Sequence, residues 1–164
     1  MTELHPITPQ LVAVYKTVRL RALADTPLAF GSTFARENQF TDEEWLARTK
    51  RLTNGRDIGF LARTEGKWSG LALCFTKEDD ASNGELISMW VAPEARRLGV
   101  GRQLIDRIST WAKERSISTL YLMVTSVNKT GTEFYSSLGF TMTGRTEPYP
   151  NGPAIEEYEM SKVL

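Results

Sequence analysis

Cysteine and histidine are almost absent, since the 164 residues include one of each, Cys74 and His5. A single cysteine excludes a disulfide within the chain, and the two residues together cannot build the usual zinc site. We therefore predict no metal centre. Cys74 lies in the apolar run 71–75, which favours a small buried residue over a reactive nucleophile.

Long apolar runs and an excess of one charge are also missing. No 18-residue apolar stretch occurs, and the first residues lack a basic start followed by an apolar run. We therefore expect no transmembrane helix, no signal peptide and a cytoplasmic location. Lys plus Arg equal Asp plus Glu at 20 each, giving a formal net charge of zero. Proteins that bind nucleic acid or membrane surfaces normally carry a basic excess, so we expect neither partner.

The remaining composition is typical of one globular domain. Hydrophobic residues make up 41% of the chain and charged residues 24%, which are ordinary values for a soluble protein. No internal repeat or long Pro/Gly/Ser-rich linker divides the sequence. Its length suits one hydrophobic core, so we predict a single domain over residues 1–164.

Local periodicity and capping signals predict the order β-α-α-β-β-β-α-β-α-β-β. The expected strands cover residues 2–7, 58–64, 68–76, 84–91, 120–124, 140–145 and 155–160. The expected helices cover residues 8–25, 41–53, 99–116 and 128–137. Strand 84–91, helix 99–116 and strand 120–124 have the length of a right-handed parallel crossover. The pattern predicts an α/β fold with a mixed sheet and helices on both faces. The four tryptophans fall in these elements and are expected in the core.

A glycine-rich turn, Arg96-Arg97-Leu98-Gly99-Val100-Gly101, lies between the apolar strand and the clearest amphipathic helix. Free amides at a helix start, with arginines beside them, favour a phosphate or pyrophosphate. The residues after Gly101 do not fit a P-loop, and a third glycine of the dinucleotide fingerprint is missing. A tight turn with solvated arginines and no ligand remains the alternative.

With its flanking segments, this turn resembles the GNAT superfamily of acyl-CoA-dependent N-acyltransferases. Arg96, Gly99 and Gly101 match the family's [Arg/Gln]-x-x-Gly-x-[Gly/Ala] signature, and the run 89–93 resembles the family's strand ending in Val-x-Pro. Asn128 and the segment 135–140 are similar to the family's Asn…Tyr…Gly-Phe segment. The resemblance is dense over about residues 84–140. It implies a mostly antiparallel sheet of six to seven strands.

The resemblance also implies an acetyl-CoA site. The amides of residues 97–102 would hold the pyrophosphate, and strand 89–91 would pair with the pantetheine arm. A backbone N–H near Trp90 or Val91 would polarise the thioester carbonyl. The expected cofactor contacts are Met89, Trp90, Val91, Arg96, Arg97, Leu98, Gly99, Val100, Gly101, Arg102, Asn128 and Tyr135. Family members more often carry alanine at Gly131, which makes the start of this helix less certain.

Two residues are candidates for the chemistry of amine acylation. We predict Tyr135 as the general acid near the CoA sulfur, with a simple core aromatic as the alternative. We predict Glu85 as the base, because some members of the family carry a catalytic glutamate at this position, whereas others place it elsewhere or use none. A solvated carboxylate at the strand end is the alternative. By the period of two, Glu85 would share one side of the strand with Ile87, Met89 and Val91.

The acceptor site is expected from loops and nearby carboxylates. The resemblance suggests Phe30, Phe34 and Tyr149 as residues that cover the acceptor, although each could serve in packing alone. Carboxylates that could line this site are those of Glu37, Asp79, Asp80 and Glu147. The sequence does not identify the acceptor amine.

These observations predict an N-acetyltransferase that moves an acetyl group from acetyl-CoA to a primary amine by direct attack in a ternary complex. The alternative is a non-catalytic module that binds or senses acyl-CoA on the same fold. A homodimer is a further expectation, because dimerisation is common in the family.

Overall fold

A computed structural model describes all residues 1–164. The strands are β1 (Thr2–Pro6), β2 (Asp57–Thr64), β3 (Lys67–Thr76), β4 (Asn83–Val91), β5 (Thr119–Thr125), β6 (Thr141–Pro148) and β7 (Glu156–Val163). The α-helices are α1 (Val12–Asp25), α2 (Phe34–Glu37), α3 (Asp42–Arg51), α4 (Val100–Glu114) and α5 (Lys129–Ser137). Short 3-10 turns are η1 (Pro9–Leu11), η2 (Pro27–Ala29) and η3 (Pro93–Ala95). None of the helices has the length and apolar character needed to span a bilayer.

The seven strands form one sheet in the order β1-β2-β3-β4-β5-β7-β6. Every neighbouring pair is antiparallel except β4 and β5, which run parallel. Helix α4 makes the connection between these two strands, as expected for a parallel crossover. The predicted mixed, mostly antiparallel sheet is therefore confirmed.

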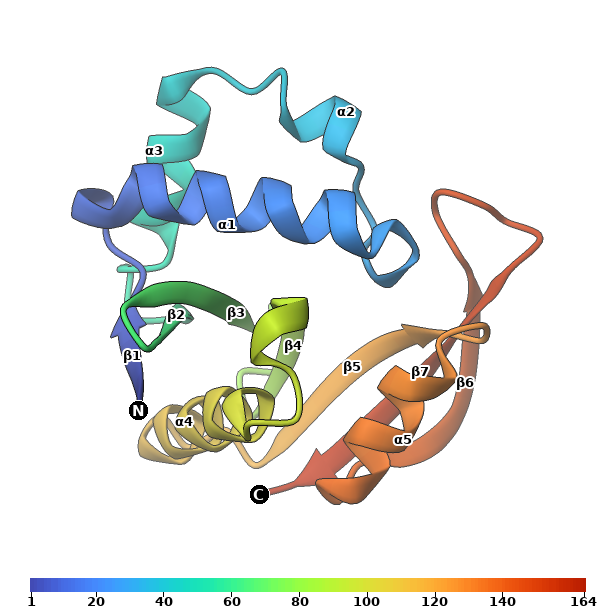
Figure 1. Ribbon diagram of the computed structural model, residues 1–164. Helices are drawn as coiled ribbons and strands as arrows, with labels where there is room; N and C mark the ends of the chain where they lie inside the picture. Colours follow the sequence, from blue (N-terminus) through green and yellow to red (C-terminus); the bar gives the residue numbers. More distant parts are fainter.

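The parallel pair β4–β5 is short, and this shapes the molecule. Only residues 83–85 of β4 pair with residues 119–121 of β5, although both strands continue further. Beyond that point the strands diverge and the sheet separates into two halves, β1–β4 and β5–β7–β6 (Figure 1). The opening between them faces the start of α4 and the side of α5.

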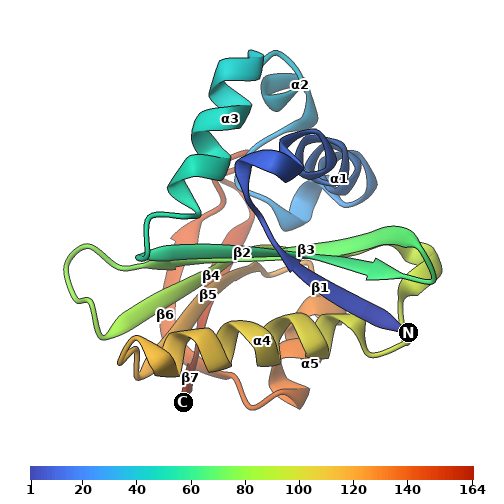
Figure 2. The same cartoon turned by 90° about the vertical axis from the view of Figure 1, so that its left-hand side faces the viewer.

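Helices cover both faces of the sheet, with α1, α2 and α3 on one side and α4 and α5 on the other (Figure 2). Two buried clusters follow this division. One contains the apolar stripe of α4, with Leu104, Ile105 and Ile108, and the other contains Tyr15 of α1 and Trp45 of α3. Removing each large apolar side chain from water contributes about 1.5–3 kcal/mol, so the two clusters hold the layers together.

Local signals explain several elements directly. Thr41 and Glu44 form the predicted capping box at the start of α3. Helix α1, however, begins at Val12 after η1, and the Thr8 side chain makes no capping hydrogen bond. Helix α2 was not expected. Trp68 is only half-buried beside the His5 ring, so its expected place in the core is wrong.

A buried ion network joins the three helices on one face. Arg19 of α1 donates to both carboxylate oxygens of Glu37 at 3.0 and 2.9 Å, and Arg48 of α3 donates to one of them at 2.7 Å. The Glu37 side chain is fully buried. Its carboxylate is therefore occupied by two arginines, and the expectation that it could line an acceptor site is wrong.

Candidate active site

A cavity of about 640 Å³ lies where the two halves of the sheet separate. The end of β4, the glycine-rich turn and one side of α5 form its walls. The residues that line it are Thr26, Ala29, Met89, Trp90, Val91, Ala95, Arg96, Arg97, Gly99, Val100, Gly101, Arg102, Asn128, Thr130, Gly131, Glu133, Phe134, Tyr135, Ser137 and Leu138. All the expected cofactor residues except Leu98, whose side chain is exposed, line this cavity.

The glycine-rich turn presents unpaired amides beside this cavity. None of the six consecutive N–H groups of residues 97–102 donates a hydrogen bond within the protein. The first bond to a carbonyl of this turn comes from Gln103, which donates to Gly99 at 3.0 Å. Gly99 has φ 83°, in the left-handed region that favours glycine. The backbone here is therefore shaped to bind an anion at the positive end of α4.

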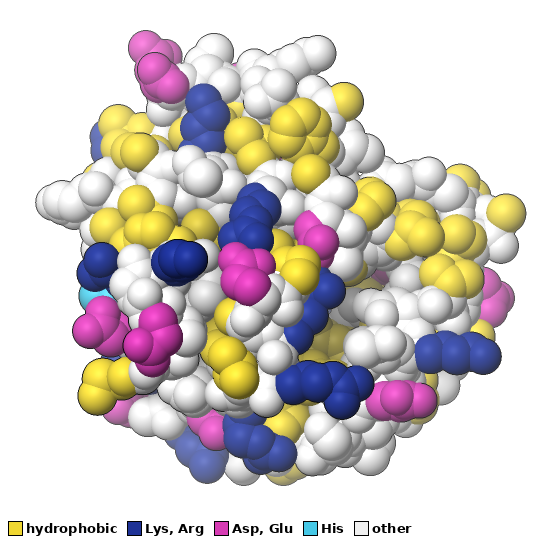
Figure 3. All heavy atoms as spheres, viewed as in Figure 1, with side chains coloured by type: hydrophobic (Ala, Val, Ile, Leu, Met, Phe, Trp, Pro, Cys, Tyr) yellow, Lys and Arg dark blue, Asp and Glu magenta, His cyan; other side chains and the backbone are white.

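Two arginines add positive charge to the same turn. Arg97 and Arg102 are both exposed, and neither makes an ion pair within the protein. Lys and Arg side chains border the hollow between the two halves of the molecule (Figure 3). Guanidinium groups bind phosphate oxygens with paired hydrogen bonds. Six free amides and two arginines offer more donors than one carboxylate can accept, so the turn suits a diphosphate.

Arg96 has a different place from its neighbours. Its guanidinium donates to the Val91 carbonyl at 2.9 Å and to the Asp25 carboxylate at 2.5 Å. The same Asp25 oxygen accepts from the Trp90 indole N–H at 2.9 Å. The Arg96 side chain thus ties the end of β4 to the end of α1, which fixes one wall of the cavity.

Helix α5 forms the opposite wall. The Asn128 side-chain oxygen accepts from the Gly131 N–H at 2.9 Å and caps the helix, which begins at Lys129. A Cβ added at Gly131 would lie 2.5 Å from the Asn128 amide nitrogen. Glycine at this position therefore gives the Asn128 side chain room to fold over the helix start, and it does not weaken that start as expected.

Tyr135 projects from α5 into the same cavity. Its ring contacts Phe134 and Phe140, with centroids 5.4 and 5.8 Å away. Its hydroxyl makes no hydrogen bond within the protein. Burial raises the pKa of Tyr135 above its ordinary value of 10.0, so the hydroxyl is protonated at neutral pH.

Strand β4 contains a bulge that sequence periodicity did not predict. Ser88 has φ 56°, and the pairing with β3 shifts by one residue at this point. Met89 therefore packs on the α4 side of the sheet together with Val91, whereas Ile87 packs on the α1 side. The expectation that Glu85 shares a face with Met89 is wrong. Glu85 lies on the α1 side, like its cross-strand neighbour Phe75.

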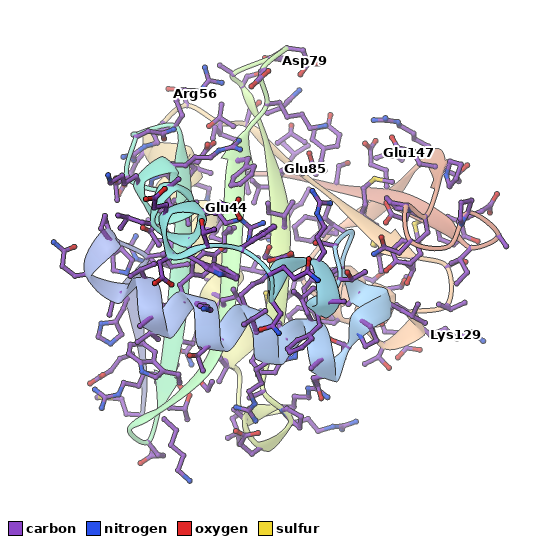
Figure 4. All side chains as sticks on the ribbon, turned by 90° about the horizontal axis from the view of Figure 1, so that it is seen from above. Glu44, Arg56, Asp79, Glu85, Lys129 and Glu147 are labelled. Atoms are coloured by element: carbon purple, nitrogen blue, oxygen red, sulfur yellow. The ribbon has the colours of Figure 1, made fainter.

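Three carboxylates lie near the gap on the α1–α2 side. Glu147 of β6 is directly opposite Glu157 of β7, and Figure 4 shows Glu85 and Glu147 on opposite sides of the gap. Burial, with repulsion from Glu147 and Glu85, raises the pKa of Glu157. Arg145 pairs with Glu147 and also with Glu159, so part of this negative charge is neutralised.

Sequence reasoning missed Glu157, although its alternation with Tyr158 on an expected strand was a usable signal. Asp79 and Asp80 do not join this group, because they lie in the connection between β3 and β4. Asp79 is at its outer end (Figure 4). The expectation that either lines an acceptor site finds no support in their position. Thr26 and Ala29 also line the cavity from the distant segment after α1, and sequence reasoning did not place them there.

The aromatic residues expected over the acceptor have separate positions. Phe30 and Tyr149 are buried, and the Tyr149 hydroxyl donates to the carbonyls of Phe30 and Pro27 at 2.6 and 3.1 Å. Tyr149 thereby fastens η2 and the residues after it to the β6–β7 connection. Phe34 is 42% exposed at the start of α2, and it is the one of the three that an incoming molecule can reach.

Known proteins with the same arrangement identify the class. A profile of the acetyltransferase (GNAT) family matches residues 20–140. The chain therefore belongs to the GNAT family of acetyltransferases, as the resemblance implied. Acetyl-CoA is the co-substrate of this class, and the unpaired amides, the arginines and the cavity bordered by the end of β4 fit its diphosphate and pantetheine arm.

Individual relatives differ in the acceptors that their names give. A ribosomal-protein alanine N-acetyltransferase of Escherichia coli is 30% identical over 115 residues, which are 69% of this chain and 76% of that protein. An IAA acetyltransferase of Azospirillum brasilense is 31% identical over 131 residues, 79% of each chain. A Salmonella typhimurium protein solved with its cofactor acetyl-CoA superposes with TM-score 0.82 at 18% identity, over 100% of this chain and 94% of the other.

Proposed function

We propose that this protein transfers the acetyl group of acetyl-CoA to a primary amine by direct attack within a ternary complex. The observation that carries the proposal is the run of six unpaired amides at residues 97–102, beside a cavity that leads to the gap between β4 and β5. This supports a cofactor held at its diphosphate by the turn. The pantetheine would lie along residues 89–91 as an added strand.

The two sides of the gap between β4 and β5 carry different residues, which supports direct attack of the amine on the thioester. Met89 and Val91 face the cavity on the α4 side, whereas Glu85 lies on the α1 side. An amine arriving from the α1 side and a thioester arriving from the α4 side would meet where the strands separate. This reaction needs no covalent enzyme intermediate. Cys74, the one cysteine, is buried away from the cavity.

The residues at the gap can divide the chemistry between them. Glu85 or Glu157 removes a proton from the ammonium form of the acceptor, directly or through water, because an alkyl amine is charged at neutral pH and only the neutral amine can attack the thioester. A backbone N–H near Trp90 or Val91 stabilises the oxyanion. Tyr135 acts as general acid toward the departing sulfur, which its protonated and unpaired hydroxyl supports.

The carboxylates also favour an acceptor class. Glu85, Glu147 and Glu157 face one gap, and one guanidinium, that of Arg145, pairs with Glu147. Excess negative charge there attracts a cationic amine over a neutral or anionic one. Of the three aromatic residues expected at the acceptor, Phe34 remains a predicted contact because it is exposed, whereas Phe30 and Tyr149 are buried behind the surface.

The first test is calorimetric titration with acetyl-CoA, followed by an amine screen with thiol detection. We expect binding and turnover with cationic amines, and initial-rate lines that intersect as in a ternary complex. Absence of binding at millimolar acetyl-CoA contradicts the proposal. Binding with slow hydrolysis and no acceptor in a broad screen favours the non-catalytic alternative, and parallel rate lines contradict direct attack.

The acidic gap is tested by Glu157→Gln, with Glu156→Gln as the matched control on the same strand. We expect Glu157→Gln to raise KM for a cationic acceptor several-fold while the affinity for acetyl-CoA is unchanged. Glu156 is exposed and points to the opposite face, so its variant should behave as the parent. Equal effects of the two changes contradict the proposed acceptor class.

We also propose that the protein works in the cytoplasm, without nucleic acid or membrane, as a monomer or homodimer. The balance of 20 basic and 20 acidic residues supports the absence of a polyanionic partner. Light scattering after gel filtration decides the oligomeric state.

A further inference from the structure

The left-handed residue at the β4 bulge has a buried partner on another element. Ser88 is the only non-glycine residue with positive φ inside a strand, at φ 56°. A side chain disfavours this conformation, because its Cβ approaches the following carbonyl oxygen. Something outside the strand must therefore compensate for it.

Arg19 of α1 supplies that compensation. Its Nη1 donates to the Ser88 hydroxyl at 3.2 Å, while its other two nitrogens hold Glu37. The guanidinium also lies over the Phe30 ring, 4.9 Å from the centroid. With 6% of its surface exposed, Arg19 is fixed on three sides, which makes it a rigid donor toward the bulge.

The bulge controls the part of β4 that borders the cavity. Residues 88 and 89 together stand opposite Ala72, since Leu71 pairs with Trp90 and Leu73 with Ile87. This extra residue turns Met89 and Val91 toward the cavity. It also reorients the N–H groups that follow, which are the groups assigned to the oxyanion.

We infer that Arg19 is a positioning residue for acetyl transfer, acting through Ser88 to hold the oxyanion-binding backbone of residues 89–91 in its reactive orientation. This inference rests on the proposed function. Arg19 and Ser88 form a clamp on the strand. Buried Glu37, itself held by the half-buried Arg48, keeps Arg19 in place, and the Ser88 hydroxyl connects Arg19 to β4. No part of the clamp touches the cofactor.

The test compares Ser88→Ala with Ser88→Gly. Both lose the hydroxyl, but glycine adopts positive φ freely whereas alanine does not. We expect Ser88→Ala to lower kcat at least tenfold and to raise KM for acetyl-CoA by a smaller factor. The diphosphate contacts at the turn are untouched, whereas residues 89–91, which would pair with the pantetheine, are displaced. We expect kcat of Ser88→Gly to stay within threefold of the parent.

Ser161 of β7 provides the matched control. It lies in a regularly paired strand, where glycine is the less favourable of the two substitutions. At Ser161 the glycine variant should therefore be the less stable, with kcat unchanged in both variants. At Ser88 the positive φ reverses this order, so that glycine is better than alanine. This order shows that the bulge conformation matters for turnover, and a change at Arg19 shows what holds it.

A second pair tests Arg19 itself. Arg19→Lys should lower kcat, and adding Ser88→Gly should restore it at least fivefold. If Arg19→Lys does not fold because Glu37 loses its partner, Glu37→Gln, which loosens the hold on Arg19, replaces it with the same expected loss of kcat and the same rescue by Ser88→Gly. The inference is overturned if Ser88→Ala has the parent kcat, or if Ser88→Gly is as impaired as Ser88→Ala.

Amide hydrogen exchange separates this inference from the proposed function. Exchange of the 89–91 amides should be at least tenfold faster in Ser88→Ala than in Ser88→Gly, whether or not any amine is acetylated. If the parent turns over no amine but this contrast in exchange appears, the proposed function fails, whereas the role of the clamp in ordering the backbone of residues 89–91 is kept. Equal exchange in the two variants overturns the clamp even in an active enzyme.

Discussion

Tyr135 is the single side chain whose chemistry can be isolated most cleanly. Its hydroxyl is the only group lost in Tyr135→Phe, while its ring contacts with Phe134 and Phe140 remain. Because general acid catalysis is worth about 10²–10⁴-fold, we expect kcat to fall about 100-fold. Affinity for acetyl-CoA should change less than twofold, as measured by calorimetry.

The control for this change is Tyr15→Phe. Tyr15 is buried in the α1–α3 layer, outside the cavity, so its variant should keep the parent kcat. If Tyr135→Phe also keeps it, the acid role is excluded and water protonates the thiolate.

Cys74 offers a second test at the same scale. Burial, with repulsion from Asp57 and Glu85, raises the pKa of its thiol from 9.0 to about 12. The thiol is therefore protonated at every pH below that value. We expect no alkylation of the folded protein by iodoacetamide at pH 8 and full alkylation in denaturant. Cys74→Ala should retain turnover. Loss of turnover in a folded Cys74→Ala variant would indicate a covalent intermediate.

Individual residues differ in how far the sequence reveals them. The cofactor-turn residues could be proposed because glycine, arginine and a helix start are adjacent in the chain. Glu37 could not be placed, because its partners Arg19 and Arg48 are 18 and 11 residues away on other helices. Burial and pairing of a carboxylate depend on tertiary contacts that composition does not show.

Among the elements, α1, α2 and α3 depend on one carboxylate. Although burial opposes ionisation, hydrogen bonds and charge from Arg19, with Ser32 and Arg48, lower the pKa of Glu37 from 4.5 to about 2. Because the pKa of Glu37 is lower in the folded state, its ionisation stabilises the folded protein above pH 4.5. This contribution is lost as the pH falls toward 2. At about 1.4 kcal/mol per pH unit, it is on the order of 3 kcal/mol.

Glu37→Gln tests this coupling. The free energy of unfolding of the parent, measured with urea, should fall between pH 5 and pH 3 more steeply than that of the variant. At pH 7 the variant should be the less stable, because its amide leaves the buried Arg19 without a counter-charge. Parallel pH curves would show that the network contributes no acid sensitivity.

The start of α5 carries a prediction of its own. Gly131→Ala places a Cβ against the Asn128 amide, so the cap is displaced at a cost of about 1 kcal/mol. Because Asn128 lines the cavity, acetyl-CoA should also bind several-fold more weakly. Gly31→Ala is the control, since nothing lies within 4 Å of its added Cβ. Equal affinity in both variants would show that Asn128 acts only on the helix.

Elements with local signals were predictable, and those set by distant partners were not. The amphipathic stripe of α4 and the Thr41–Glu44 capping box lie within single segments, so their helices follow from the sequence. The bulge at Ser88 has no such signal, because serine carries no preference for positive φ. The short helix α2 ends at Glu37, whose burial is set by arginines from two other helices.

The whole molecule consists of two half-sheets joined by few contacts along β4 and β5. Pairing between these strands covers only residues 83–85 and 119–121, and Tyr149 and Thr125 add links through η2 and its flank. The rest of β4 has no strand partner on that side. A sequence shows both strands but not how far they pair, so periodicity does not reveal the gap.

A cofactor lying between the halves should therefore stabilise the entire domain. At a free concentration 100-fold above Kd, a ligand adds about 2.7 kcal/mol, which raises Tm by roughly 5–10 °C for a domain of this size. We expect this shift with acetyl-CoA and with CoA, but not with ATP, which lacks the pantetheine arm. Arg97→Ala and Arg102→Ala should reduce the shift and weaken its dependence on salt, because each removes a phosphate contact. A Tm that rises equally with ATP would indicate a phosphate site at the turn with no ligand bridging the two half-sheets.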